Sequence, residues 1–499
     1  MKLSAGILKN IDSAKVIVPN ESLLGLPEKV LQFGTGMLLR GLPDYFIDKA
    51  NRKGIFNGRI VVVKSTSKGD TASFNAQNNL YTLCIRGIEN GKRKEENIIN
   101  SSISRVLNAG EEWEEILKCA HNRNLQIVIS NTTEVGLKLV KDDISNHPPL
   151  SYPGKLLAFL VERFQAFNGS ADSGLIIIPT ELIPDNGKKL KSIVLELAHL
   201  SGLHKEFIEW LNQCNFFCSS LVDRIVTGIP GEKIKHEIEN ELGYEDDLLT
   251  LCEVYCLWAI EGDGNVKRIL SFAVADEGLI ISPDIALYRE LKLRLLNATH
   301  TMSCGVAFFS NINTVKEAME DKLMSVYIAD LMKKEIGPAI PYEINSDTLD
   351  AYSEKVLDRF RNPHINHIWK NITLNYSSKI KLRCVPVVMN FYKSNNRVPE
   401  LFALGFAAYI YFMKAVKQNE KLFFGVNNGN PYLIEDEEAE NFYHMWQTLP
   451  INEVANRTLK NIDLWGTDLS TLPGFQQSVI DKLNSIINNG MRFTLESIK

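Results

Sequence analysis

Lys292, Asn297 and His300 are three side chains whose types together suit proton transfer at the hydroxyl of a secondary alcohol. A lysine can act as acid and base once burial or neighbouring dipoles lower its pKa from the ordinary value near about 10.4. An asparagine amide can donate a hydrogen bond to a developing alkoxide, and a histidine can hold the reacting oxygen in line. The set predicts metal-independent acid/base chemistry at a secondary alcohol that exchanges a hydride.

The spacing of these residues leaves a second interpretation open. On an α-helix, Lys292 and Asn297 would lie about 140° apart around the axis, so they would converge only where the helix wraps the edge of a cleft. Otherwise Lys292 would be a surface charge, Asn297 a helix cap and His300 an ordinary packed histidine. The geometry of the helix that carries the three residues distinguishes between these interpretations.

A glycine turn near the start of the chain predicts a dinucleotide site. Gly34 and Gly36 follow a short apolar run, and glycines at a strand–helix turn let pyrophosphate approach the backbone and the first N–H groups of the helix. Leu39 stands where the full fingerprint has a third glycine, so a purely structural turn is the alternative. The predicted cofactor contacts here are Phe33, Gly34, Thr35, Gly36, Met37, Leu38 and Arg40.

Two further strand ends supply candidate cofactor contacts. A β-branched run ends at Lys64, before Ser65–Ser67, where an acidic residue would bind a ribose 2′-hydroxyl. A lysine there could instead bind a 2′-phosphate, so these residues alone leave NADP open. Asn131 and Thr132 follow another strand and are expected to meet the nicotinamide ribose, with a helix cap as the alternative for Thr132 or Thr133.

The first half of the chain alternates apolar runs with helix-period stretches. Strands are expected over 29–33, 59–64, 125–130 and 174–179, and helices near 38–46, 112–121 and 156–167. This rhythm predicts an α/β fold, a Rossmann-type parallel sheet domain over residues 1–275. A mostly α-helical domain is expected over 276–499, with helices near 285–298, 314–334, 347–359 and 401–418 and a loop between helices at 427–431.

Composition sets the broad class of protein. The 499 residues carry a net charge of −5, with 45% hydrophobic and 23% charged residues, which is typical of a globular protein and does not favour a nucleic-acid partner. The apolar runs are too short for a signal peptide or a bilayer span, so no membrane partner and a cytoplasmic location are expected.

Eight cysteines in so long a chain do not suggest a disulfide scaffold. Cys214 and Cys218 are four residues apart, as are Cys252 and Cys256, so each pair could share a helix face and together hold zinc. Because both stretches are otherwise apolar and the spacing differs from common zinc motifs, buried thiols are the favoured interpretation and no metal is expected.

Several ordered blocks carry a family resemblance. They are LQFGTGMLLR at 31–40, SNTTEVG at 130–136, IPTELI at 178–183, FCSSLVDRIVTG at 217–228, the Lys292/Asn297/His300 set, and RFRNP at 359–363. Together they resemble the long-chain polyol dehydrogenases, the mannitol dehydrogenase family. Within it, the blocks are most similar to the branch that reduces tagaturonate to altronate with NADH in hexuronate breakdown.

The resemblance implies a Rossmann-type domain and a helical domain with the active site between them, and NAD in preference to NADP. It implies that Lys292 is the general acid/base of a zinc-independent reaction and that Asn297 and His300 bind the reacting oxygen. Asp223 matches an aspartate near the substrate, and Arg359 matches a position that faces the polyol chain.

Two departures from the family pattern bear on the substrate. Thr227 stands where the general signature has proline or serine, and Leu182 stands where the polyol enzymes have a second oxyanion asparagine. The role of that asparagine is expected to pass to Asn186 or Asn131. The difference weakens a mannitol substrate and suits a uronate.

A uronate substrate would need a cation for its carboxylate. Each candidate for this contact could also be a solvated charge; the candidates are Arg361, His367, Lys379, Lys381 and Arg383. Fructuronate reduction, a mannitol-type polyol dehydrogenase and a non-catalytic dinucleotide sensor remain alternatives, and the sequence leaves the oligomeric state open.

Overall fold

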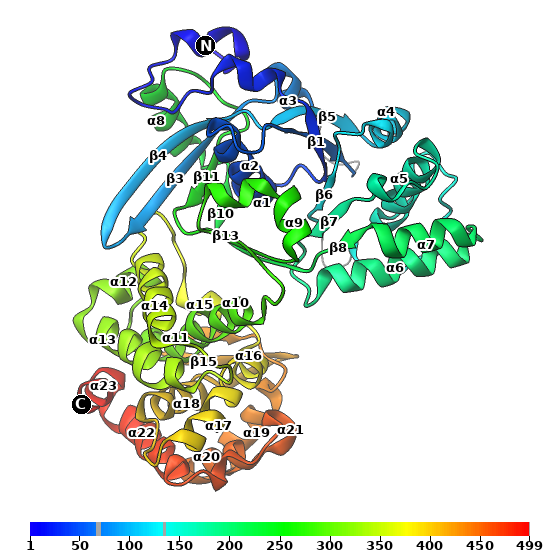
Figure 1. Cartoon of the computed structure of the whole chain (residues 1–499). Coiled ribbons are helices and arrows are strands. Elements are labelled where there is room, and N and C mark those ends of the chain that lie inside the picture. Colours follow the sequence, from blue (N-terminus) through cyan, green and yellow to red (C-terminus); the bar gives the residue numbers. More distant parts are fainter. Residues whose placement is uncertain (66–70, 133–135, 499) are drawn as a thin grey trace. The chain divides into compact units, whose positions relative to one another are not determined.

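The computed structural model describes residues 1–65, 71–132 and 136–498, which form two compact units (Figure 1). Unit 1 comprises Met1–Gly87 and Arg93–Ile285, and unit 2 comprises Ile88–Lys92 and Ala286–Lys499. The short segment Ile88–Lys92, the tip of a hairpin, therefore belongs to the second unit although the first half of the chain supplies it. Each unit has its own hydrophobic core.

A six-stranded parallel sheet forms the centre of unit 1. Its strand order is β5-β2-β1-β6-β7-β8, so the chain builds outward from β1 first on one side and then on the other. The strands are β1 (Glu28–Phe33), β2 (Arg59–Lys64), β5 (Ile103–Asn108), β6 (Ile127–Ser130), β7 (Ile176–Pro179) and β8 (Phe216–Phe217). This sheet confirms the predicted Rossmann-type fold and the four predicted strands.

Both faces of the sheet are buried, because alternate residues of each strand point into different cores. Val62 of β2 packs into one core, while Val61 and Val63 pack into another. Period-two alternation of this kind explains why the strands read as continuous apolar runs. The helices of unit 1 are α1 (Met37–Gly41), α2 (Pro43–Arg52), α3 (Ala72–Ala76), α4 (Trp113–Lys118), α5 (Tyr152–Ala166), α6 (Asn186–Leu200), α7 (Lys205–Cys214), α8 (Glu232–Leu242) and α9 (Gly264–Ile269).

Two smaller sheets of unit 1 were not predicted. One has the order β10-β11-β3-β4, and the other has the order β13-β12-β9. Their strands carry many polar residues, or are too short to show a period. They are β3 (Tyr81–Glu89), β4 (Lys92–Asn100), β9 (Ser220–Asp223), β10 (Val226–Gly228), β11 (Thr250–Glu253), β12 (Leu257–Glu261) and β13 (Leu279–Ser282).

Unit 2 is mostly helical, as predicted. Helix α18 is apolar on all sides and packs against α11 and α22. The helices are α10 (Ala286–Leu291), α11 (Thr299–Phe309), α12 (Val315–Glu320), α13 (Lys322–Asp330), α14 (Ser346–Phe360), α15 (Trp369–Ile372), α16 (Tyr376–Arg383), α17 (Val385–Ser394), α18 (Glu400–Phe412), α19 (Ala439–Thr448), α20 (Ile451–Lys460), α21 (Ile462–Trp465), α22 (Phe475–Asn489) and α23 (Met491–Ser497).

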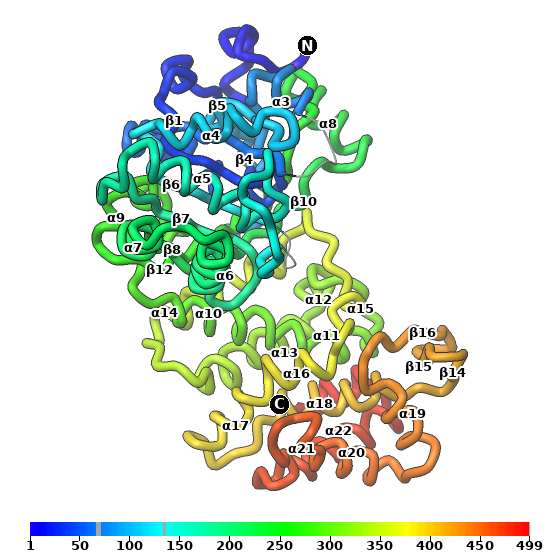
Figure 2. Tube along the Cα trace, turned by 90° about the vertical axis from the view of Figure 1, so that its right-hand side faces the viewer, coloured from blue at the N-terminus to red at the C-terminus, as the bar shows by residue number. Residues whose placement is uncertain are grey.

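A three-stranded antiparallel sheet in unit 2 corrects two predictions. Helix α18 ends at Phe412, so the predicted helix over 401–418 is too long, and β14 (Lys417–Asn419) follows. The predicted loop between helices at 427–431 is instead the turn joining β15 (Leu422–Asn427) to β16 (Asn430–Ile434), beside α19 (Figure 2). Asn428 and Gly429 both have positive φ, the conformation that an Asn-Gly hairpin turn requires.

The predicted helix over 314–334 is also divided. Asp321 ends α12 and starts α13, since its side chain accepts hydrogen bonds from the N–H groups of Leu323 and Met324, 3.0 Å from each. A π-helical segment, η8 (Leu331–Ile336), follows α13. The capping aspartate explains the break within a continuous helical pattern.

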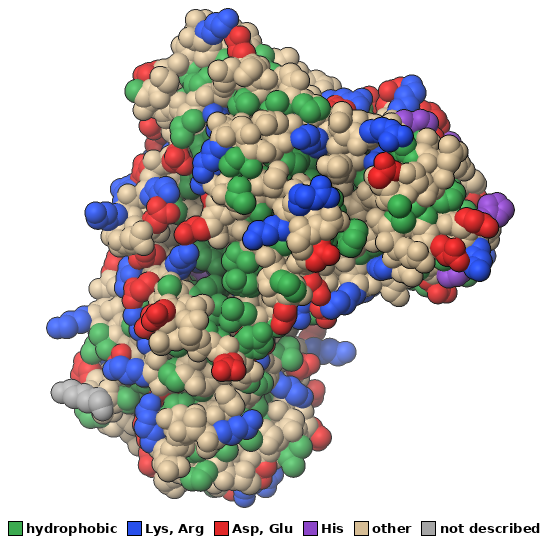
Figure 3. Space-filling view, in the orientation of Figure 1, with side chains coloured by type: hydrophobic (Ala, Val, Ile, Leu, Met, Phe, Trp, Pro, Cys, Tyr) green, Lys and Arg blue, Asp and Glu red, His purple; other side chains and the backbone are tan. Residues whose placement is uncertain are grey.

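The surface fits the composition. Acidic and basic side chains are interspersed on the face shown in Figure 3, with hydrophobic side chains between them. In the described part of the chain, no helix is both long enough and apolar enough to cross a bilayer.

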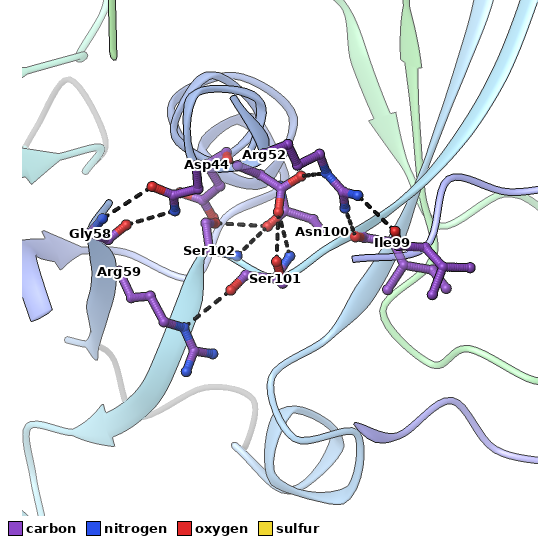
Figure 4. A network of polar contacts seen from close by, with 11 residues as sticks. Asp44, Arg52, Gly58, Arg59, Ile99, Asn100, Ser101 and Ser102 are labelled. Carbon is purple, nitrogen blue, oxygen red and sulfur yellow. Dashed lines mark hydrogen bonds and ion pairs between the residues drawn. The ribbon is translucent and has the colours of Figure 1, made fainter. Parts of the chain in front are cut away.

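A buried polar network anchors α2, the helix that follows the glycine turn (Figure 4). Asp48 Oδ1 accepts hydrogen bonds from the N–H and hydroxyl of Ser101, at 2.8 and 2.9 Å, and Asp48 Oδ2 accepts one from Arg52 Nε at 2.6 Å. The Asn51 side chain exchanges two hydrogen bonds with the backbone of Gly58. These contacts tie α2 to the segment before β5 and to the start of β2.

Replacing Asp48 with alanine should lower the free energy of unfolding of unit 1 by about 3 kcal/mol, because Arg52 and Ser101 lose a buried acceptor. Chemical denaturation followed by tryptophan fluorescence would measure the change. Glu115→Ala, which breaks the exposed pair with Lys118, is the matched control and should leave the transition unmoved. Equal effects of the two variants would contradict the anchoring role.

Candidate functional site

The glycine turn lies at the switch point of the parallel sheet. β1 has β2 on one side and β6 on the other, and the direction in which strands are added reverses between β1 and β6. Loops at the carboxyl ends of such strands line the ligand crevice of open α/β sheets. Gly34 follows β1 and Asn131 follows β6, and the Asn131 N–H donates to the Phe33 carbonyl at 3.1 Å. The two predicted cofactor loops are therefore adjacent.

The two glycines of the turn lie in different surroundings. Gly34 has φ +128°, and an added Cβ would lie 2.9 Å from the Leu39 side chain and 3.1 Å from the Asn131 carbonyl oxygen. At Gly36 an added Cβ would meet nothing within 4 Å, so this backbone faces open space. The turn therefore has a tight bend followed by an accessible stretch of backbone, which fits a pyrophosphate.

Leu39, which stands at the position of the third glycine, has a packing role of its own. Its side chain is fully buried and packs under Gly34. Helix α1 ends at Gly41, and a separate helix, α2, starts at Pro43. A third glycine usually allows a helix to pack closely on the strand. Here the first helix is short and ends at Gly41, and the side chain of Leu39 fills the space between helix and strand.

The side chains of Arg40 and Phe33 make packing contacts inside unit 1. Arg40 is buried, its Nη1 donates to the Leu248 carbonyl at 2.8 Å, and its guanidinium lies over the ring of Tyr81. The Phe33 ring is buried against Tyr152. The Arg40 side chain therefore has a packing role, and the ring of Phe33 is buried, so any contact of these two residues with the cofactor stays a prediction for their backbone.

Glu181 is a residue of the β6–β7 edge that the sequence analysis missed. It is buried, and it accepts hydrogen bonds from the Thr132 N–H at 2.7 Å, the Thr132 hydroxyl at 3.0 Å and the Ser130 hydroxyl at 3.3 Å. Burial raises the pKa of its carboxyl, and these hydrogen bonds oppose the rise. Glu181 thus fixes the position of Thr132. The sequence signal that could have identified it is a charged residue two positions after the end of a buried strand, β7.

Asn131 and Asn186 were the two candidates to replace the missing oxyanion asparagine. The Asn186 amide is buried and donates to three carbonyls, those of Pro179, Glu181 and Ser220. It has no donor left for a substrate, so that prediction is wrong. Asn131 donates to the hydroxyl and the carbonyl of Thr180, at 2.9 and 3.2 Å, and is half-buried.

The structure places the remaining residues of unit 1 as follows. Lys64 is the last residue of β2 and is only 4% exposed. Asp223 is the last residue of β9 and is buried, while the guanidinium of its neighbour Arg224 donates to the carbonyls of Gly41 and Glu253. The predicted positions Thr66, Ser67 and Thr133 lie outside the described residues.

A π-helical segment, η7 (Lys292–Ala298), carries Lys292 and Asn297. The hydrogen bonds of a π-helix join residues five apart, so residues at this spacing follow one another along the same side of the helix. The 140° separation expected from α-helical geometry therefore does not apply. Lys292 and Asn297, both half-buried, are brought to one side of the segment.

His300 is enclosed by aromatic rings in the first turn of α11. Its ring stacks on Phe360, with centroids 4.2 Å apart and an angle of 13°, and meets the edges of His367 and Trp369 at 4.9 and 5.8 Å. Burial lowers the pKa of His300 well below 6.5, and His367, Arg359 and Arg383 lower it further. The imidazole is therefore neutral. Its Nε2 is buried and has no hydrogen-bond partner among the described residues.

The predicted substrate residues of unit 2 fall into two groups. His367 contacts His300 directly, and the charge of Arg359 lowers the pKa of both imidazoles. Arg361, by contrast, is bound to Asp358 at 3.1 Å, and the other carboxylate oxygen of Asp358 accepts from the Gly91 N–H at 3.0 Å. The hairpin tip that contains Gly91 thus packs against the end of α14.

The cysteine pairs do not share helix faces. Cys214 ends α7 whereas Cys218 follows β8, and Cys252 lies in β11 whereas Cys256 lies beyond it. Burial raises the pKa of all four thiols. Within the described ranges, three or more His, Cys, Asp or Glu side chains are nowhere grouped so as to hold a metal ion.

Stability should fall on acidification because the His300 imidazole is neutral in the folded protein. The folded-state pKa lies below that of the unfolded chain, so the unfolded state binds more protons below about pH 6.5 and stability is lost there. The loss is at most about 1.4 kcal/mol per pH unit from this residue. Denaturant titrations between pH 7 and 5 should show a smaller loss for His300→Gln than for the wild type. The exposed His204→Gln is the control, and a wild-type slope in both variants would contradict a buried neutral His300.

Comparisons with known sequences match almost the whole chain. A family model described as the mannitol dehydrogenase Rossmann domain matches residues 28–271, and one described as the mannitol dehydrogenase C-terminal domain matches residues 284–487. An altronate oxidoreductase of Bacillus subtilis is 37% identical over 94% of this chain and 95% of its own length. Altronate oxidoreductases of Halalkalibacterium halodurans and Shigella flexneri are 35% and 36% identical, over 95% and 93% of this chain and 93% and 96% of their own lengths.

Solved structures show the same fold. Mannitol 2-dehydrogenase of Pseudomonas fluorescens, in a ternary complex with NAD and D-mannitol, matches with a TM-score of 0.67 and 23% identity, over 99% of both chains. A D-sorbitol dehydrogenase in substrate-free form matches with a TM-score of 0.78 and 21% identity, over 99% of this chain and 100% of that one.

Proposed function

Because this chain belongs to the mannitol dehydrogenase family, we propose that it is an NADH-dependent oxidoreductase that reduces tagaturonate to altronate, reversibly. The altronate oxidoreductases that are 35–37% identical over nearly the full length support the substrate. The alignment of Lys292 with Asn297 on a π-helical turn, three residues before His300, is the observation that carries the reaction type.

The proposed proton donor for reduction is the Lys292 ammonium group. When bound, the reduced nicotinamide supplies the hydride that turns the keto carbon into a secondary alcohol. The oxygen then carries a developing negative charge, which the Lys292 proton neutralises, and in the reverse direction the same amine accepts the hydroxyl proton. Asn297 would donate its amide N–H to this oxygen.

His300 is proposed to bind the same oxygen without adding charge. Its Nε2 is buried and unpartnered among the described residues, and the imidazole is neutral, so one tautomer presents an N–H donor there. Stacking on Phe360 fixes the plane of the ring. Because a buried donor without a partner is costly, the substrate oxygen would satisfy it.

The cofactor contacts are proposed for the glycine turn and its neighbours. The N–H groups at the start of α1, from Gly36 to Leu38, would bind the pyrophosphate, and the accessible backbone at Gly36 leaves room for it. Asn131 and Thr132, held by Thr180 and Glu181, would face the nicotinamide ribose. Lys64 is too deeply buried to present its charge to a 2′-phosphate, which favours NADH over NADPH.

A substrate panel tests the proposal. Initial rates of NADH oxidation should be higher with tagaturonate than with fructuronate, fructose or tagatose, and NADPH should support less than a tenth of the kcat/KM of NADH with the same acid. Faster turnover of a neutral ketose than of either keto-uronate would overturn the assigned substrate. Binding of NADH without turnover of any of the four would instead support a dinucleotide sensor.

Replacing Lys292 with alanine should lower kcat by about 10²–10⁴-fold, because the proton donor is lost, while NADH binding stays intact. Stopped-flow rates and NADH fluorescence would measure the two quantities. Added methylamine should restore part of the rate if the lysine transfers a proton. Lys393→Ala, which removes an exposed lysine of α17, is the control. Wild-type rates in Lys292→Ala would refute the assignment.

A further inference from the structure

Two cations on α16, Lys379 and Arg383, form no ion pair with a carboxylate of the described residues. They are four residues apart, so they lie on the same side of the helix. Lys379 Nζ donates to the Ile372 carbonyl at 2.9 Å, and Arg383 Nη1 donates to the Thr301 hydroxyl at 3.2 Å. In the described chain, neither has a carboxylate within ion-pair distance. We call Lys379 and Arg383 the α16 basic pair.

The α16 basic pair is partly withdrawn from water. Both side chains are half-buried, and burial is the largest cause of the lowered pKa of each. Asp436 is the carboxylate whose charge acts on Lys379, but its oxygens already accept hydrogen bonds from the Ser377 N–H and hydroxyl and from the Glu438 N–H. Partly buried charges that lack a protein counter-ion are costly, so an anion is expected beside them.

The pair lies beside the proposed oxygen-binding histidine. The hydroxyl that Arg383 holds belongs to Thr301, the residue after His300. The charge of Arg383 lowers the pKa of His300, and the charge of Lys379 lowers that of His367. The Nε2 of His300 has no hydrogen-bond partner within residues 1–65, 71–132 and 136–498, which is an independent sign that a polar ligand belongs here.

Building on the proposed function, we propose that Lys379 and Arg383 bind the carboxylate of a sugar acid whose reacting oxygen is held by His300, and so select acids over neutral sugars. A guanidinium binds a carboxylate through two parallel hydrogen bonds, and the neighbouring ammonium adds a point charge. A neutral sugar would leave both cations without a counter-ion.

The other basic candidates of this stretch are less suited to the role. Arg361 is already paired with Asp358. Lys381 lies on the same helix as the α16 basic pair, but its side chain is exposed and donates to the Asp463 carbonyl at 2.9 Å. Lys381 therefore provides a matched control, since its removal deletes an equal charge from α16.

The test compares Arg383→Gln, Arg383→Lys and Lys381→Gln. Arg383→Gln should lower kcat/KM for tagaturonate by about 30-fold or more, mainly through KM, and should reduce the ratio of kcat/KM for tagaturonate to that for tagatose by a similar factor. Arg383→Lys should recover only part of the loss, because an ammonium group keeps the charge but cannot make the two parallel hydrogen bonds. Lys381→Gln should behave as the wild type, and circular dichroism would establish that the variants fold.

A binding measurement separates this inference from the proposed function. Calorimetric titration of the NAD-loaded enzyme with altronate should give much weaker binding for Arg383→Gln than for Lys381→Gln, whatever the turnover. If the wild type reduces tagaturonate but Arg383→Gln keeps both its affinity for altronate and its selectivity, the inference is overturned while the function stands. If the wild type reduces only neutral ketoses and does not bind altronate, both are overturned.

Discussion

The hydrogen-bond pattern of one short helical segment is the constraint on which the proposed chemistry depends. With α-helical geometry in η7, Lys292 and Asn297 would lie about 140° apart around the axis, and they would meet one oxygen only where the helix wraps the edge of a cleft. The π-helical pattern winds this stretch more loosely, so that residues five apart recur on one side. The π-helical segment is the one that carries the Lys292 amine and the Asn297 amide. Local deviations of this kind from α-helical geometry are frequent at functional sites.

The charges of unit 2 support the same assignment. Burial, His367 and the cations Arg359 and Arg383 all lower the pKa of His300, so the neutral imidazole can orient an oxygen without competing with Lys292 for the proton. The same cations would stabilise an acidic substrate. The same cations thus account for both a neutral histidine and an acidic substrate. A neutral polyol would leave these cations without a counter-ion.

The sequence was sufficient to predict the fold class, because fully buried parallel strands read as continuous apolar runs and Gly34 marks the first turn. It was insufficient where local geometry changes without a change in hydrophobicity. The π-helical winding of η7 has no sequence period of its own. The Asn428–Gly429 turn was taken for a loop between helices because its flanking strands are partly exposed and lack a continuous apolar run. The packing role of Arg40 could not be predicted, since its partners Leu248 and Tyr81 are distant in sequence. The roles of Lys292, Asn297 and His300 stay predictions.

The hairpin tip Ile88–Lys92 makes the second unit discontinuous in sequence. During synthesis, Gly91 is made long before α14, so its N–H can donate to Asp358 only after that helix has been made. A fragment cut at the 285/286 boundary would leave Asp358 without this partner, close to Arg359 and Arg361. A gene encoding only the helical half would therefore omit a segment that the first half of the chain contributes to unit 2.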